Sequence, residues 1–205
     1  MLLLFVLSGI VTLPIIYSVS SRLSKTNRVE ANILIVEGWL PPYAIELAYN
    51  ECIKNSYEQV ITTGIRISGY HEVSVNGYTG YNTNDISSHA DLAANKLISL
   101  GLDSSLVLAV PGKKVSINRT LSSALAFRDW LKTSDIKVKG INIITMGTHA
   151  RRTWMTYNKI LDKNHNIGII SLPDYRERSS RKYKVLKTLR ESAGLFYYWF
   201  LLLPY

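Results

Sequence analysis

The chain has 205 residues, of which 47% are hydrophobic and 19% charged, and this composition excludes a disordered chain, a collagen and a coiled coil. The length suits one domain with short extensions, and the single cysteine excludes a disulfide framework and a cysteine-rich zinc module. Basic residues exceed acidic ones by nine, but the segment 176–190, with seven basic side chains and one acid, supplies six of these charges. The rest of the chain is only mildly basic, so we do not expect a nucleic-acid-binding surface.

The chain begins with an apolar segment. Residues 1–19 contain no charged side chain and are about long enough to cross a bilayer as a helix. A cleaved signal peptide and a buried soluble helix are the alternatives. No basic stretch precedes the segment and no small-residue cleavage motif follows it, while Pro14 disfavours a buried helix. We therefore predict a single-pass membrane anchor over residues 1–20, followed by a linker over residues 21–30.

Residues 31–175 alternate between strand and helix patterns. Short apolar runs rich in β-branched residues predict five buried strands, at residues 32–36, 59–63, 106–110, 141–146 and 167–172. Helical periodicity between them predicts four helices, at residues 43–56, 87–100, 120–132 and 149–161. This alternation predicts an α/β fold, namely a Rossmann-like, mostly parallel five-stranded sheet with helices on both faces.

One long polar segment interrupts the alternation. Residues 65–85 contain three glycines, three tyrosines and several asparagines, and this segment is too long and too polar for an ordinary connection between a strand and a helix. Long loops in compact domains are often functional, so we expect a cover over the strand ends. The alternative is a surface excursion or small hairpin without function.

The C-terminal region, residues 176–205, is first basic and then apolar. Its last part, LFYYWFLLLPY, is too short to span a bilayer, and we expect a C-terminal helix. Tyr197, Tyr198 and Trp199 favour a membrane interface, where the basic run would contact anionic headgroups. The alternative is a terminal helix packed on the domain, with its basic side chains in solvent.

Several common signatures are missing from the sequence. There is no G-x-G-x-x-G motif after the first predicted strand, no Walker A loop and no G-x-S-x-G motif. The four histidines lack the spacing of metal ligands, so no metal site is expected. The sequence identifies no cofactor.

The residues that follow the fourth predicted strand are the most informative. Thr148 is placed to cap the helix 149–161, and Arg151 and Arg152 fall in its first turn. A helix N-terminus is already positive, so two arginines there are unfavourable unless an anion binds between the helix end and the guanidinium groups. We therefore predict an anion site, with His149 on the same helix face as Arg152.

The alternative is that the two arginines lie in solvent or pair with Asp174 or Glu177. If an anion binds here, replacing Arg152 should weaken ligand binding and leave stability nearly unchanged. A second group of polar side chains, including Asn118 and Thr120, precedes the third predicted helix and would lie at the same sheet edge. Helix capping is the alternative explanation for this second group.

Together these residues resemble the YdcF/SanA/ElyC family of bacterial proteins, over about residues 31–165. Four short motifs at the predicted strand ends carry the resemblance: Ile35-Val36-Glu37-Gly38, Thr62-Thr63-Gly64, the Asn118–Thr120 segment and His149-x-x-Arg152. The chain departs from the family pattern at Glu37 and Trp39, in a turn that is usually rich in glycine. The resemblance implies a Rossmann-like sheet with a pocket at the strand ends, an N-terminal membrane anchor and a role in the cell envelope.

Two classes of function follow. We expect a membrane-anchored envelope protein that binds a small anionic ligand, phosphate-bearing or nucleotide-like, at the carboxyl-terminal edge of the sheet. Its catalytic residues would be Glu37 and His149, as acid, base or proton carrier. Its ligand-binding residues would be Gly38, Thr63, Gly64, Asn118, Thr120, Arg151 and Arg152. The alternative is a non-catalytic, membrane-tethered binding module for a lipid-linked carrier or a partner protein, which does not require Glu37 and His149 to converge.

Two observations disagree about the side of the membrane on which the domain lies. Arg22, Lys25 and Arg28 follow the apolar segment, and the positive-inside rule alone therefore places the domain in the cytoplasm. The family that the chain resembles places its domain on the envelope, periplasmic side. We expect the envelope side, with the lipid bilayer and a small anionic ligand as partners.

Overall fold

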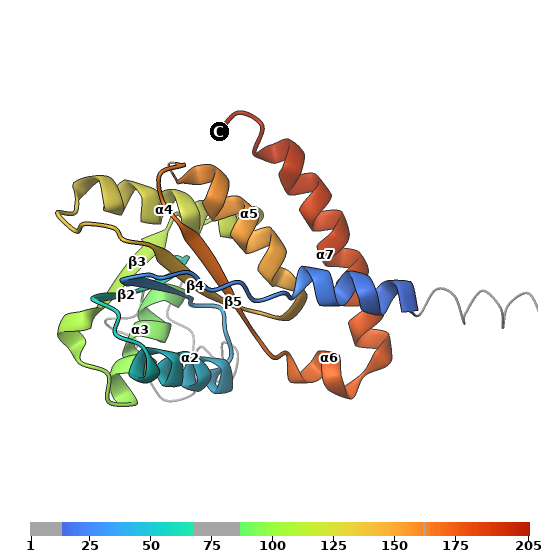
Figure 1. Cartoon of the computed structure of the whole chain (residues 1–205), viewed down its shortest axis with the longest axis horizontal. Helices are drawn as coiled ribbons and strands as arrows, with labels where there is room; N and C mark the ends of the chain where they lie inside the picture. The colour runs from blue at the N-terminus through green and yellow to red at the C-terminus, as the bar shows by residue number, and fades with distance from the viewer. Residues whose placement is uncertain (1–13, 68–86, 162) are drawn as a thin grey trace, which may run out of the picture.

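Figure 1 shows the fold in a computed structural model, which describes residues 14–67, 87–161 and 163–205. The centre is one sheet of five strands: β1 (Ile33–Glu37), β2 (Gln59–Ile65), β3 (Val107–Gly112), β4 (Ile141–Met146) and β5 (Ile167–Leu172). The strand order is β3-β2-β1-β4-β5, and all four pairings between neighbours are parallel. The predicted Rossmann-like α/β fold is therefore confirmed.

Helices lie on both faces of the sheet (Figure 1). They are α2 (Pro42–Lys54), α3 (His89–Ser99), α4 (Arg119–Thr133), α5 (Ala150–Ile160), α6 (Tyr175–Ser179) and α7 (Arg181–Leu201), with 3₁₀ turns η1 (Ser104–Leu106) and η2 (Gly147–His149). A further helix covers residues 14–23. The four helices predicted between the strands correspond to α2 to α5, with bounds that agree within two residues.

The core is divided in two by the sheet, and β1 shows why its sequence is continuously apolar. Ile33 and Ile35 face a cluster that includes Phe127 of α4 and residues of α5 and α7. Leu34 and Val36 face the opposite cluster, built with α2 and α3. All five residues of β1 are buried, as expected of a central parallel strand covered on both faces.

The connectivity creates a switch point beside β1. The chain passes from β1 to β2 and β3 on one side of the sheet, and later returns to β4 and β5 on the other side. The connections on the two sides of β1 therefore diverge at the carboxyl ends of β1 and β4. Open α/β sheets bind their ligands in this place.

The N-terminal segment of the described chain contacts β5 and the start of α7. The segment that we predicted as a linker lies along the edge of β5, where the backbone of Asn27 bonds that of Ile169 in both directions, at 2.8 and 2.9 Å. The helix α7 packs beside α5 and buries Thr188, Glu191 and Tyr198. No helix in residues 14–67, 87–161 or 163–205 is long and apolar enough to cross a membrane.

Two predictions fall partly on residues outside this description. Residues 1–13 of the predicted anchor are not among the described residues, and the helix 14–23 continues past the end that we predicted for the anchor. Most of the polar segment 65–85, predicted as a cover over the strand ends, also lies outside the described residues.

Candidate functional site

The last residue of β1, Glu37, carries a buried carboxylate. Its side chain accepts hydrogen bonds from the indole Nε1 of Trp39 at 2.9 Å and from the hydroxyl of Thr153 at 3.3 Å. The hydroxyl of Thr145, from the neighbouring strand β4, donates a further bond. The residue is only 3% exposed, and none of these three donors carries a charge. The carboxylate is thus desolvated but fully hydrogen-bonded, without a neutralising cation among these donors.

The imidazole of His149 lies next to this carboxylate. It follows β4 in the turn η2, and its Nε2 is 3.9 Å from Oε2 of Glu37 and 3.4 Å from the hydroxyl of Thr120. The ring of Trp39 meets His149 edge-on, with ring centroids 5.2 Å apart. Glu37 and His149 therefore converge at the carboxyl ends of β1 and β4, with Trp39 in contact with both.

A second carboxylate lies on the other side of His149. Glu191, from the inner face of α7, places Oε2 at 3.1 Å from Nδ1 of His149 and accepts a bond from Nε of Arg152 at 3.0 Å. Nη2 of Arg152 is 2.8 Å from the same Nδ1. Nδ1 can donate to Glu191 or accept from Arg152, but not both at once. When it donates to Glu191, Nε2 keeps a free lone pair directed toward Thr120 and Glu37, which is the form that a general base requires.

The electrostatics of this cluster favour a charged Glu191. Burial raises the pKa of the Glu191 carboxyl, but the hydrogen bond and charge of His149, together with Arg152, outweigh burial and lower the pKa to about 2. The guanidinium of Arg152 also lies over the ring of Tyr198, with Cζ 5.0 Å from the ring centroid. Arg152 is therefore held by two residues of α7.

This pairing changes our explanation of the arginines at the start of α5. The structure pairs Arg152 with neither Asp174 nor Glu177 but with Glu191, which the sequence analysis did not consider. Arg151 does not join the cluster, because its guanidinium stacks on Trp154 at 4.5 Å from the ring centroid.

The expected cap of the helix was also wrong. Thr148 does not cap α5; its backbone N–H and its hydroxyl both donate to Oε1 of Glu177, at 3.3 and 3.0 Å. A carboxylate of the protein itself therefore occupies the place beside η2 where we expected an external anion. Together with the Arg152–Glu191 pair, it accounts for the helix end and for one of the two arginines that led us to predict a ligand here.

The three predicted binding residues at the ends of β1 and β2 have a packing role. The backbone N–H of Gly38 donates to the carbonyl of Thr63 at 2.6 Å, and the hydroxyl of Thr63 lies 3.2 Å from that of Tyr157. A Cβ atom added at Gly38 would lie 2.2 Å from the carbonyl oxygen of His89. A Cβ atom added at Gly64 would lie 2.7 Å from the Cβ atom of His89. The glycines therefore allow the first turn of α3 to approach the sheet.

The predicted residues at the start of α4 divide between two roles. Thr120 is buried, and its hydroxyl contacts His149 as described above. Asn118 precedes α4 in the left-handed region, with φ at 58°, and its amide donates to the hydroxyl of Tyr197 at 3.2 Å. Asn118 therefore fastens the start of α4 to α7 rather than capping the helix.

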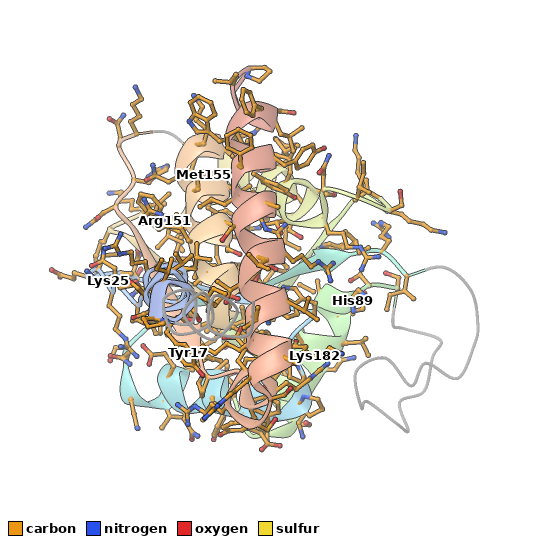
Figure 2. The ribbon with its side chains drawn as sticks, turned by 90° about the vertical axis from the view of Figure 1, so that its right-hand side faces the viewer. Tyr17, Lys25, His89, Arg151, Met155 and Lys182 are labelled. Atoms are coloured by element: carbon orange, nitrogen blue, oxygen red, sulfur yellow. The ribbon has the colours of Figure 1, made fainter. Side chains whose placement is uncertain are left out.

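Basic side chains gather at the same edge of the sheet, around the ends of β2 and β3. These four exposed residues, here called the basic rim, are Arg66, Lys113, Lys114 and Arg119. Within the described part of the chain, none of them forms an ion pair. Burial lowers the pKa of His89, and the positive charge of Arg119 lowers it further. Figure 2 shows His89 and Arg151 on opposite sides of α7. The rim therefore gathers four positive charges, without an ion pair among the described residues, at the edge where Glu37 and His149 converge.

A separate polar pocket of about 580 Å³ lies between the helix 14–23 and the end of β5. Tyr17, Asp174, Glu177 and Lys184 are among the residues that line it. Asp174 is already paired with Lys187 at 2.6 Å, and Glu177 with Thr148. Neither Glu37 nor His149 lines this pocket, so we place the candidate site at the ends of β1 and β4.

Glu191 is the residue of the cluster that sequence reasoning missed. It is the only acidic residue of α7, which otherwise contains basic, small, aromatic and aliphatic residues. A single acid on the same helix face as the buried Thr188 and Tyr198 indicates that its carboxylate pairs with a group inside the protein. Trp39 was noted only as a departure from the family pattern, although its indole is a donor to Glu37.

The described residues contain no group of three or more His, Cys, Asp or Glu side chains arranged to hold a metal ion. Comparison of the sequence with protein-family models and with curated proteins gives no match. The function is therefore inferred from the site itself.

Proposed function

We propose that the chain is a member of the YdcF/SanA/ElyC family, that it binds a small phosphate-bearing anion at the carboxyl edge of its sheet, and that Glu37 and His149 catalyse a reaction on this ligand. The observation that carries the proposal is the convergence of these two side chains at the switch point, with Nε2 and Oε2 at 3.9 Å. Paired titratable groups in a desolvated site are typical of acid–base catalysis.

In this proposal His149 is the residue that moves the proton. Glu191 holds Nδ1 and leaves the Nε2 lone pair directed toward Thr120 and Glu37, so Nε2 accepts a proton from the bound ligand or from a water molecule. Glu37 stabilises the imidazolium that forms, because its carboxylate is close and has no other cation among its hydrogen-bond donors. Trp39 excludes water from the pair and strengthens this interaction.

The basic rim supports an anionic ligand. Its four side chains lie at the ends of β2 and β3 and at the first turn of α4, on the same edge as Glu37 and His149. Four positive charges that form no ion pair with the described residues repel one another, and a phosphate-bearing ligand would relieve this repulsion. The anion is thus proposed to bind between the rim and His149, and no longer at the start of α5, where Glu177 accepts from the backbone of Thr148 and Glu191 pairs with Arg152.

The proposal includes attachment to the lipid bilayer through residues 1–20, with the domain on the envelope side. Its support is the uncharged apolar sequence of residues 1–19 and, for the side of the membrane, the family resemblance.

A second candidate function is the non-catalytic binding module for a lipid-linked carrier or a partner protein. One observation favours it: Glu37 and His149 are only 3% and 7% exposed, and each already has partners within the protein. In this case the two side chains would fix the shape of the edge, and the basic rim alone would bind the ligand.

The anion-binding part is tested by the thermal stability of the full chain with pyrophosphate. A ligand at a hundred times its dissociation constant stabilises the native state by about 2.7 kcal/mol, and we expect a rise in melting temperature of about 5–10 °C. Arg119→Ala should weaken binding roughly ten- to a hundredfold, because it removes a charge-assisted bidentate contact.

The matched control is Lys132→Ala, at the far end of the same helix α4. This variant should keep the affinity of the unmodified chain. Equal affinities of the Arg119→Ala and Lys132→Ala variants for pyrophosphate would exclude the basic rim as the anion site.

A further inference from the structure

The helix α7 has two different faces. Its inner face buries Thr188, Glu191 and Tyr198 against the domain and holds His149 and Arg152 in place. Its outer face carries large apolar side chains that are between 49% and 65% exposed: Leu186, Leu189, Phe196, Phe200 and, just past the helix end, Leu203. These residues follow one another at intervals of three, four or seven positions, so they form one continuous stripe along the helix.

The residues beside the stripe are basic or aromatic. Lys182 and Arg190 are exposed and flank its first half, whereas Tyr197 and Trp199 are exposed along its second half. The only acid of α7, Glu191, is buried on the inner face. The outer face of α7 is therefore apolar, aromatic and positive, and it carries no negative charge of its own.

This charge distribution selects among the partners that an apolar stripe could bind. A second copy of α7 packed in parallel on the stripe would bring Lys182 and Arg190 close to their own counterparts, and like charges would oppose that contact. An antiparallel copy would bring no acidic side chain to them, because the outer face of α7 has none. An anionic lipid surface, in contrast, complements the basic residues and also accepts the apolar and aromatic side chains. Tyr and Trp side chains are enriched at the level of the lipid headgroups.

The helix 14–23 indicates how such a surface would be oriented. In Figure 1 this helix crosses α7, and its residue-14 end points outward beyond α7. Figure 2, turned to look at that side, shows α7 lying lengthwise across the face, with the helix 14–23 almost end-on beside it. The two are in contact, because Nζ of Lys184 lies 4.2 Å from the ring centroid of Tyr17. A bilayer parallel to α7 on this face would also meet the chain where it continues into the uncharged residues 1–13.

We propose that the outer face of α7 lies on an anionic bilayer surface, with its apolar stripe in the interfacial region and its basic residues on the lipid headgroups. The helix axis is parallel to the membrane plane, and the stripe reaches about 5–10 Å into the boundary between headgroups and acyl chains. The contact is independent of the proposed anion site, although the same helix carries Glu191 on its inner face.

The test is the depth of a nitroxide label on the full chain in vesicles. Phe200→Cys places the label on the stripe, and Ile98→Cys places it on α3, on the opposite face of the sheet. The native Cys52 is buried, and burial raises the pKa of its thiol to about 12, so it does not compete for the label at neutral pH. The vesicles contain phosphatidylcholine, with or without phosphatidylglycerol.

With phosphatidylglycerol present, the label at Phe200→Cys should collide several-fold more often with oxygen, relative to a water-soluble nickel complex, than the label at Ile98→Cys. Arg190→Glu should reduce this difference, whereas Lys132→Glu, on α4, should leave it unchanged.

Three results would overturn the proposal. The first is an aqueous environment for the label at Phe200→Cys in protein that is bound to anionic vesicles. The second is magnetic coupling between labels at Phe200→Cys of different molecules, which would show that a second copy covers the stripe. The third is equal insertion with and without phosphatidylglycerol, which would exclude the role given to the basic residues.

Discussion

Replacing Arg152 by alanine should lower the free energy of unfolding by about 2–3 kcal/mol, because it leaves the buried carboxylate of Glu191 without its cation. The side chain of Arg152 is 19% exposed and that of Glu191 8%, so little water can replace the lost contact. The cation–π contact with Tyr198 is lost as well. His149 remains as a partner of Glu191, which keeps the loss below that of a fully isolated buried charge.

Arg151→Ala is the matched control, since it removes the neighbouring arginine of the same helix turn. Arg151 is exposed and stacked on Trp154, so its loss should change the free energy of unfolding by no more than about 0.5 kcal/mol. Urea denaturation of the two variants measures the difference. Equal effects of the two replacements would mean that the Arg152–Glu191 pair contributes nothing to stability. They would agree with the sequence-based prediction that replacing Arg152 leaves stability nearly unchanged.

The pH dependence gives a second view of the same pair. The Glu191 carboxyl has its pKa lowered from 4.5 to about 2 in the folded chain, so its contribution is complete above about pH 5 and is lost as the pH falls toward 2. The stability difference between the unmodified chain and Arg152→Ala should therefore be largest at neutral pH and should shrink in acid. A difference that stays constant from pH 7 to pH 3 would mean that the arginine acts through packing alone.

Replacing His149 by glutamine should lower kcat about 10²–10⁴-fold in any reaction that the chain catalyses, with KM changed only a few-fold. The assay measures turnover of a panel of phosphate-bearing compounds that includes p-nitrophenyl phosphate, pyrophosphate and nucleoside diphosphates. Glu37→Gln should also lower kcat, because an amide cannot stabilise the imidazolium as a carboxylate does. Both replacements should weaken the stabilisation of the transition state more than they weaken the binding of the ligand.

The control for this prediction is His165→Gln, in the segment before β5 at the opposite edge of the sheet. It should leave kcat unchanged. A loss of affinity without any loss of kcat in the His149→Gln variant would contradict the role of proton carrier. Binding of pyrophosphate without turnover of any compound would favour the non-catalytic module.

The secondary structure could be predicted from the sequence because the central strands are buried on both faces. Runs such as Ile141–Met146 and Ile167–Leu172 are mostly apolar or β-branched, with Asn142, Gly168 and Ser171 as the exceptions, and both strands have the predicted bounds. The convergence of Glu37 and His149 was also predictable, since Glu37 ends one central strand, His149 follows its neighbour, and the carboxyl ends of parallel strands share one edge.

The remaining parts of the site depend on packing that periodicity does not encode. Glu191 lies 42 positions after His149, on a helix whose direction and inner face are set only when it packs on α5. The different roles of the two arginines follow from helix geometry, because residues three apart share a face and residues two apart do not. Arg152 therefore reaches the Nδ1 atom of His149, whereas Arg151 stacks on Trp154.

The imidazole NMR signals of His149 during a titration with pyrophosphate test the central claim most directly. The chain has four histidines, and the His149→Gln variant assigns the signals by difference. We predict that pyrophosphate shifts the Nε2 signal of His149, and that Arg119→Ala moves the midpoint of this shift to a roughly ten- to hundredfold higher ligand concentration while Lys132→Ala leaves the midpoint unchanged. Bound pyrophosphate that leaves both nitrogen signals of His149 unchanged would contradict a ligand site formed by the basic rim and the Glu37–His149 pair.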